Sequence, residues 1–386
     1  MKANKPYRIL ALDGGGIRGL VSAILLECLE KKLQELEPKR EVRLGDYFDA
    51  IAGTSTGSII ACGVANGISA TEIKDLYLNR GIEIFPKFWN VIRGMVGRIT
   101  NGFSQPIYDG TGLETVLKDV FRNQFGEQLL FEDLPKPTII TSYDTYNRQA
   151  VVFKNTEPLL GKIPVWEICR SSAAAPVAFP AYEMKNEHFL EYYKAKGYKI
   201  PPEGGIPLID GGVVANDPAL CAIAERLHWN LYPPTNPKKW IPEGYEWVEI
   251  KDIVVASFGT GQPIARGIGI EQARGWGAAE WASPFKGVPI IDILFDGSTD
   301  ATDYIAQQIL WKENYFRFQP LLDEASSIPA FNANPRKLDA LKNRVEIYCK
   351  EVDEQLNDLV KILTSETNKQ SVVGEENVTS LSVYPC

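Results

Sequence analysis

Short apolar runs that end at glycine-rich turns and continue into amphipathic segments recur along this chain. The first run, Tyr7–Leu12, ends at Asp13 and three glycines, and apolar residues then recur at helical spacing over residues 18–36. A second run at 47–52 leads through another glycine-rich turn into a helical pattern over 58–65. Each unit predicts a buried strand, a tight turn and a helix.

The same alternation continues through the rest of the chain. Further strands are expected at 138–142, 150–153, 207–209 and 251–258, and further helices at 111–122, 164–175, 218–228, 298–312 and 336–363. Strands that alternate with helices predict an α/β fold with a mostly parallel sheet covered on both faces.

The domain organisation follows from where this pattern stops. Residues 1–365 are expected to form one domain, and the polar, aperiodic residues 366–386 are expected to form a flexible tail. No apolar stretch is long enough to span a membrane, and residues 1–6 are too short and polar for a secretory signal. The sequence therefore predicts a cytoplasmic protein.

The charge balance restricts the partners. The formal net charge is −8, so a nucleic-acid partner is not expected, and any membrane contact has to be local. Residues 84–103 contain no acidic side chain, but they contain three basic ones and apolar residues at helical spacing. This segment predicts either transient peripheral membrane contact or a helix packed on the core.

The six cysteines are scattered along the chain without paired spacing, so free thiols are expected. No cluster of metal-ligating residues is visible in the sequence. The sequence therefore predicts no metal and no other cofactor.

Ser55 is the strongest candidate for a nucleophile. It lies in the sequence GTSTG at 53–57, between a predicted strand and a predicted helix. Glycines two residues on either side allow the strained turn of a nucleophile elbow, which projects the serine hydroxyl over the sheet edge. An ordinary glycine-rich turn is the alternative.

Gly14, Gly15 and Gly16 follow the first predicted strand and leave backbone N–H groups unshielded at the start of a helix. Such groups can stabilise an oxyanion or a phosphate. The spacing also matches a dinucleotide fingerprint, but the acidic residue required about 20 positions later would fall within the predicted helix. A phosphate-binding P-loop is also excluded, because no Gly-Lys-Ser/Thr follows these glycines.

A nucleophilic serine needs a base, and the chain contains only two histidines, His188 and His228. His188 lies in a charged segment, and His228 closes a helix about 15 Å from its start, at about 1.5 Å per residue. Asp210 follows a short apolar strand and precedes two glycines, so we expect it at the sheet edge near Ser55. A turn-capping role for Asp210 is the alternative.

The segments DGGGIRG at 13–19, GTSTG at 53–57 and DGG at 210–212 together resemble the signature of patatin-like phospholipases. SSAAAPVAFP at 171–180 and SFGTG at 257–261 resemble further patatin segments, so the resemblance spans about residues 7–320. It implies a three-layer α/β/α fold, a Ser55–Asp210 dyad and an oxyanion hole at Gly14, Gly15 and Gly16. It also implies calcium-independent hydrolysis of phospholipids, galactolipids or acylglycerols.

Three points stay open at the level of sequence. Arg18 could hold the glycine loop or meet a lipid phosphate. A conventional α/β-hydrolase esterase would use His188 or His228 in a triad with the serine. A lipid-binding module without turnover would keep the fold and lose the chemistry.

Overall fold

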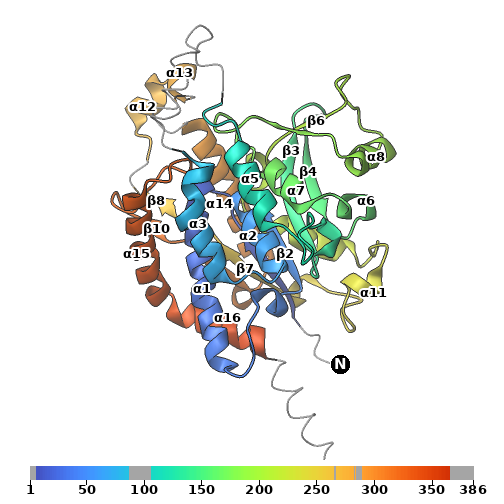
Figure 1. Cartoon of the computed structure of the whole chain (residues 1–386). Helices are drawn as coiled ribbons and strands as arrows, with labels where there is room; N and C mark the ends of the chain where they lie inside the picture. Colours follow the sequence, from blue (N-terminus) through green and yellow to red (C-terminus); the bar gives the residue numbers. More distant parts are fainter. Residues whose placement is uncertain (1–5, 87–105, 265–266, 282, 284–288, 366–386) are drawn as a thin grey trace, which may run out of the picture.

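The computed structural model describes residues 6–86, 106–264, 267–281, 283 and 289–365, and its centre is a mixed β-sheet (Figure 1). The predicted tail and most of the segment 84–103 lie outside these residues. Five neighbouring strands run parallel, in the order β9-β7-β1-β2-β3. They are β1 (Tyr7–Leu12), β2 (Ala50–Thr54), β3 (Thr138–Asp144), β7 (Ile253–Phe258) and β9 (Tyr315–Phe318).

Antiparallel strands complete the sheet beyond β3. β4 (Gln149–Lys154) and β6 (Ile206–Asp210) both pair with β3, and β5 (Tyr182–Met184) pairs with β6. β8 (Gln262–Pro263) and β10 (Leu321–Leu322) form a separate short ladder. The prediction of a mostly parallel sheet is therefore confirmed.

Helices cover both faces of this sheet. The longer ones are α1 (Gly19–Leu36), α2 (Thr56–Ala65), α3 (Ala70–Ile84), α5 (Thr111–Val120), α7 (Val165–Ser172), α8 (Glu187–Ala195), α10 (Ala219–His228), α14 (Pro289–Ile309), α15 (Pro335–Glu351) and α16 (Asp353–Thr364). The shorter ones are α6 (Pro158–Gly161), α9 (Gly212–Ala215), α11 (Pro237–Trp240), α12 (Ile270–Gly275) and α13 (Ala278–Trp281).

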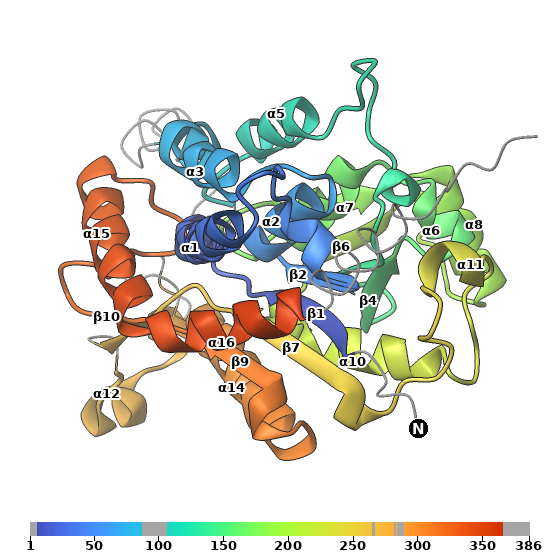
Figure 2. The ribbon, with the colours of Figure 1, turned by 90° about the horizontal axis from the view of Figure 1, so that it is seen from below.

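Side chains along the central strand β1 point alternately to the two faces of the sheet and so contribute to two separate layers of the core. Leu10 and Leu12 of β1 are buried in one apolar cluster with residues of α1, α2 and α7. Ile9 and Ala11, which point to the opposite face, are buried in a second cluster with residues of α10 and α14. Figure 2 shows these two sets of helices on opposite sides of the strands. The expected three-layer α/β/α fold is therefore confirmed.

Several predicted boundaries were wrong for identifiable reasons. A 3-10 turn at Leu44–Tyr47 takes up the start of the second apolar run, so β2 begins only at Ala50. The helix expected over 336–363 is two helices, α15 and α16, because the chain breaks at Val352. The helix expected at 298–312 begins earlier, at Pro289.

The prediction of free thiols was wrong for one pair of cysteines. The sulfurs of Cys28 on α1 and Cys349 on α15 form a disulfide, with the two Cα atoms 6.6 Å apart. Cys62, Cys169 and Cys221 are free, as predicted. The pairing could not be read from the sequence because the two cysteines are 321 residues apart and meet only through helix packing.

Within the described ranges, no helix is both long enough and apolar enough to cross a membrane.

Candidate active site

Ser55 lies in the turn between β2 and α2 and has a backbone conformation that L-residues rarely adopt, with φ 54° and ψ −122°. The turn is tight because α2 starts directly beside β1. A side chain at Gly57 would place its Cβ 2.1 Å from the carbonyl oxygen of Leu12, so only glycine fits there. The sequence therefore forms a strained strand–turn–helix elbow around Ser55, as its glycine spacing indicates.

The hydroxyl of Ser55 donates a hydrogen bond to Asp210, with 2.6 Å between Oγ and Oδ2. Both side chains are buried. The backbone N–H of Gly212 donates to the other carboxylate oxygen of Asp210, Oδ1, at 2.8 Å. The carboxylate is therefore fixed from both sides, with one oxygen left for the serine.

Strand pairing explains how Asp210 comes to lie beside Ser55. β6 runs antiparallel to β3, and their register pairs Asp210 with Ser142. β2 runs parallel to β3 and pairs Thr54 with Thr141, one residue away on each strand. Asp210 therefore lies at the level of Ser55 because of register, and not because two parallel strands end at the same edge.

Burial raises the pKa of Asp210 to about 7, because a carboxylate is poorly stabilised away from water. The hydrogen bonds from Ser55 and from the Gly212 N–H act in the opposite direction and lower this pKa. The balance gives a carboxylate that is much more basic than an exposed aspartate, next to a serine hydroxyl.

The end of α7 and the residues that follow it hold both members of this pair. The Oγ of Ser172 accepts a hydrogen bond from the backbone N–H of Ser55 at 2.8 Å. The carbonyl of Ala174 accepts one from the N–H of Asp210 at 3.0 Å. No local sequence pattern singles out Ser172; the only signal is its position in the segment 171–180 that resembles patatins.

The glycine loop differs in detail from the expected oxyanion hole. The N–H of Gly14 already donates to the carbonyl of Asn216 at 3.0 Å. Among the residues that the structure describes, the N–H groups of Gly15 and Gly16 have no hydrogen-bond acceptor. Gly16 has φ +59°, and its Cα lies against the carbonyl of Ala330, so a side chain has no space there. The oxyanion hole stays a prediction, and of its three N–H groups only that of Gly14 has an acceptor within the described residues.

A buried ion-pair cluster supports the start of this loop. Arg317 on β9 donates to both carboxylate oxygens of Asp13, at 2.9 and 2.6 Å, and to Ser257 Oγ at 2.7 Å. Its Nη1 also lies 3.5 Å from Asp217. Burial raises the pKa of Asp13 to about 7, while Arg317 opposes this shift and Asp217 adds to it. No local sequence pattern points to Arg317, since its partner Asp13 is 304 residues away.

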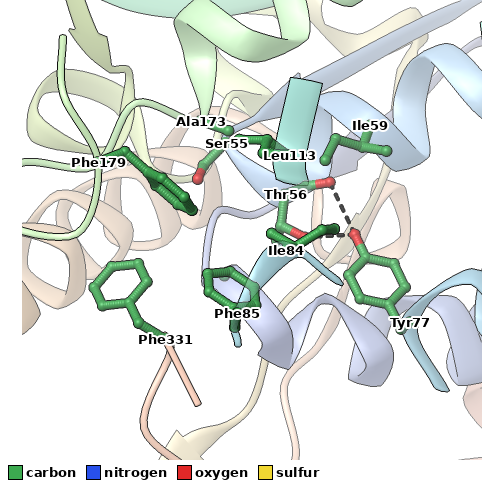
Figure 3. A pocket seen from close by; sticks show the side chains of 11 residues that line it. Ser55, Thr56, Ile59, Tyr77, Ile84, Phe85, Leu113, Ala173, Phe179 and Phe331 are labelled. Atoms are coloured by element: carbon green, nitrogen blue, oxygen red, sulfur yellow. Dashed lines mark hydrogen bonds between the residues drawn. The ribbon is translucent and has the colours of Figure 1, made fainter. Parts of the chain in front are cut away.

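An apolar pocket opens beside Ser55, between α2, α3 and α5. Figure 3 shows Phe85, Phe179 and Phe331 along one side of it, with Ile59 and Tyr77 on the other. The Tyr77 hydroxyl is hydrogen-bonded to Thr56 Oγ1 at 2.5 Å, so these polar groups satisfy each other. Among the described residues that line the pocket, none carries a charged side chain. It therefore suits an apolar group attached to whatever reacts at Ser55.

The two histidines lie away from this centre. His188 is the second residue of α8, and its Nε2 lies 3.8 Å from Oε1 of its neighbour Glu187. His228 is the last residue of α10; its side chain is exposed and stacks on the ring of Tyr232. Neither lines the pocket or hydrogen-bonds to the Ser55 side chain, whose acceptor is Asp210.

Arg18 lies in the 3-10 turn that leads into α1 and is buried. It does not line the pocket beside Ser55. Both roles considered for Arg18, holding the glycine loop and meeting a lipid phosphate, stay predictions.

For a metal, the described part of the chain offers no group of three or more His, Cys, Asp or Glu side chains that could hold one. The polar groups around Ser55 are instead a single carboxylate, hydroxyls and backbone N–H groups.

The fold and this geometry define an α/β/α protein with a hydrogen-bonded serine–aspartate pair at a strained strand–turn–helix elbow. The sequence profile described as patatin-like phospholipase matches residues 10–223, more than half of the chain. The chain belongs to the patatin-like phospholipase family. Membership supports activity on lipid esters.

Individual relatives span most of the chain. It is similar to Patatin-like protein 2 of Arabidopsis thaliana, with 32% identity over 83% of this chain and 77% of the relative. A potato (Solanum tuberosum) relative named "Probable inactive patatin-3-Kuras 1" is 28% identical over 81% of this chain and 78% of its own. Among solved structures, VipD from Legionella pneumophila aligns over 89% of this chain and 67% of its own, with 12% identity and a TM-score of 0.36.

Proposed function

We propose that this protein hydrolyses carboxylic ester bonds of phospholipids, galactolipids or acylglycerols, with Ser55 as the nucleophile and Asp210 as its base. The observation that carries the proposal is the 2.6 Å hydrogen bond from Ser55 Oγ to the buried carboxylate of Asp210. A nucleophile within hydrogen-bond reach of its base is the geometry that acyl transfer requires. The adjoining apolar pocket supports a lipid as the substrate.

The proposed reaction has two stages. In the first, Asp210 takes the proton of Ser55 while Oγ attacks the ester carbonyl, and the N–H groups of Gly15 and Gly16 stabilise the oxyanion. The intermediate then expels the alcohol, which receives the proton from Asp210, and leaves an acyl-enzyme. In the second stage, Asp210 takes a proton from water, and the resulting hydroxide attacks the acyl group. The intermediate then releases the fatty acid, while Asp210 returns the proton to Ser55 Oγ.

The raised pKa of Asp210 supports its role as the base. An exposed aspartate has a pKa near 4 and removes a serine proton poorly, whereas an effective base has a pKa near the working pH. Burial raises the pKa of Asp210 to about 7. The carboxylate therefore combines a suitable pKa with direct contact to the hydroxyl that it would deprotonate.

The proposal is tested by covalent labelling with a fluorophosphonate probe, which reacts with activated serines. We expect the wild type to be labelled on the peptide that contains Ser55, and Ser55→Ala to lose both labelling and ester hydrolysis while it unfolds at the same temperature. The matched control Ser69→Ala, at the distant start of α3, should keep both. Labelling that persists in Ser55→Ala would remove this serine from the mechanism.

A lipid-binding protein without turnover is the second candidate, and the potato relative named as a probable inactive patatin is the observation that favours it. Its distinguishing result is a wild-type protein that binds lipid but is not labelled and releases no fatty acid. The intact hydrogen bond between Ser55 and Asp210 argues against it.

A further inference from the structure

Part of the pocket wall comes from outside the region that the family profile matches. The profile ends at residue 223, yet the ring of Phe331 lines the pocket beside Ser55. Its ring centroid lies 6.2 Å from that of Phe85, which in turn lies 5.8 Å from that of Phe179. The wall therefore combines residues near the sequence signature with a residue from the C-terminal third of the chain.

Hydrogen bonds fix the backbone that carries Phe331. The hydroxyl of Tyr108 donates to the carbonyl of Phe331 at 2.7 Å. The carbonyl of the preceding residue, Ala330, accepts the N–H of Ile17 at 2.7 Å and lies against Gly16. The turn at 330–331 is thus anchored to the glycine loop and to the pocket at the same time, which places the ring in a defined position relative to Ser55.

We propose that this pocket binds the acyl chain of the ester and that Phe331 sets the longest chain that fits. The inference rests on the proposed function, because it assigns the pocket to the acyl group transferred to Ser55. The lining is apolar, and its hydroxyls at Thr56 and Tyr77 are paired with each other. A charged head group would lose its hydration there without gaining a partner, whereas an acyl chain gains from burial.

The apolar wall sets the limit on chain length. An acyl chain that extends beyond the lining residues has to displace part of the wall or extend into solvent.

Phe331 is the wall residue best suited to set this limit. Phe85 and Phe179 are buried, and each packs against Tyr108 as well as against the other. The ring of Phe331 is only partly buried, and it packs against the ring of Phe85. Its removal therefore widens the pocket with less disturbance to the core than removal of either buried ring.

The test compares kcat/KM for nitrophenyl butyrate, octanoate, decanoate and laurate. We expect kcat/KM of the wild type to fall towards the longer end of this series, where the chain meets the ring of Phe331. In Phe331→Ala the ratio of laurate to octanoate should rise about tenfold, since a few methylene contacts in an apolar pocket change discrimination by that order. Phe189→Ala, a buried phenylalanine that packs on Phe153 away from the pocket, is the control for a general loss of stability. It should leave the ratio unchanged.

A variant that narrows the pocket tests the same assignment from the opposite side, because it should shorten the longest acyl chain that fits. Ile59 lines the pocket from α2, so Ile59→Phe should lower the ratio of decanoate to butyrate about tenfold. Unchanged chain-length ratios in both pocket variants would overturn the inference, even if Ser55 remains essential. Failure of the wild type to hydrolyse any of these esters, with no labelling of Ser55, would overturn the proposed function instead.

Discussion

At the scale of single residues, the ionisation of the proposed base Asp210 should be visible in the pH dependence of activity. Burial raises the pKa of Asp210 from its ordinary value of 3.8 to about 7, and only the carboxylate can accept the Ser55 proton. We therefore expect kcat/KM for a soluble ester to be flat above about pH 7.5 and to fall about tenfold per pH unit below about 6. A plateau that extends down to pH 5 would contradict this assignment of the base.

The raised pKa of Asp210 supports the proposed chemistry near neutral pH, but it lowers the free energy of unfolding there. The folded protein keeps the Asp210 proton at pH values between about 4 and 7, where the unfolded chain has already lost it. The proton that folded Asp210 retains therefore stabilises the folded state fully below about pH 4, and this stabilisation is lost as the pH rises through 7. Asp210 therefore supports the proposed chemistry at a cost in stability near neutral pH.

Asp210→Asn separates these two effects. The amide keeps the shape of the side chain but cannot take a proton, so kcat should fall by on the order of a thousandfold or more. The unfolding temperature at pH 8 should be equal to that of the wild type or higher, because no buried carboxylate has to ionise.

The two histidines provide the controls for this variant. His188→Ala and His228→Ala should each keep activity within about a factor of two, because neither residue reaches Ser55. Loss of activity in either, with Asp210→Asn still active, would support the triad alternative.

At the scale of elements, Arg317 links β9 to the loops that follow β1 and α9. Removal of its charge in Arg317→Met would leave Asp13 and Asp217 buried without their cation, a change that typically costs about 3–5 kcal/mol. Because the pKa of Asp13 is raised to about 7, protonation relieves part of this cost at lower pH. The loss in the free energy of unfolding, measured by urea titration, should be larger at pH 8 than at pH 5.5.

Lys361→Met is the matched control for this measurement. It removes a cation from an exposed pair with Asp358, so it should cost about 1 kcal/mol or less at either pH. If Arg317→Met loses the same free energy of unfolding at pH 8 and pH 5.5, the ionisation of Asp13 does not cause the loss.

Elements with a strong local pattern were predictable from the sequence. The run Tyr7–Leu12 and the helix that follows the glycine loop were placed within one residue. α3 was not predicted, although Ser69 and Glu72 form a capping box whose spacing is visible in the sequence. The direction of β6 was not predictable, because a five-residue strand does not encode which neighbour it pairs with.

At the scale of the whole molecule, the candidate site depends on contacts that no local pattern reveals. Ser55, Asp210 and the glycine loop were singled out because each follows an apolar run at a turn. Phe331 and Arg317 were not, since their partners Phe85 and Asp13 are distant in the sequence and meet them only in the folded chain. Local patterns thus indicated the proposed reactive groups, and tertiary packing supplied the residues that support them and the pocket wall.

The central claim is that this chain cleaves lipid esters at Ser55. Its most direct test is to profile the products formed from a mixed natural lipid extract by the wild type and by Ser55→Ala, purified in parallel and shown to unfold at the same temperature. We predict free fatty acids and the matching deacylated lipids with the wild type, and neither above background with the variant. Equal release of fatty acids by both proteins would contradict the account.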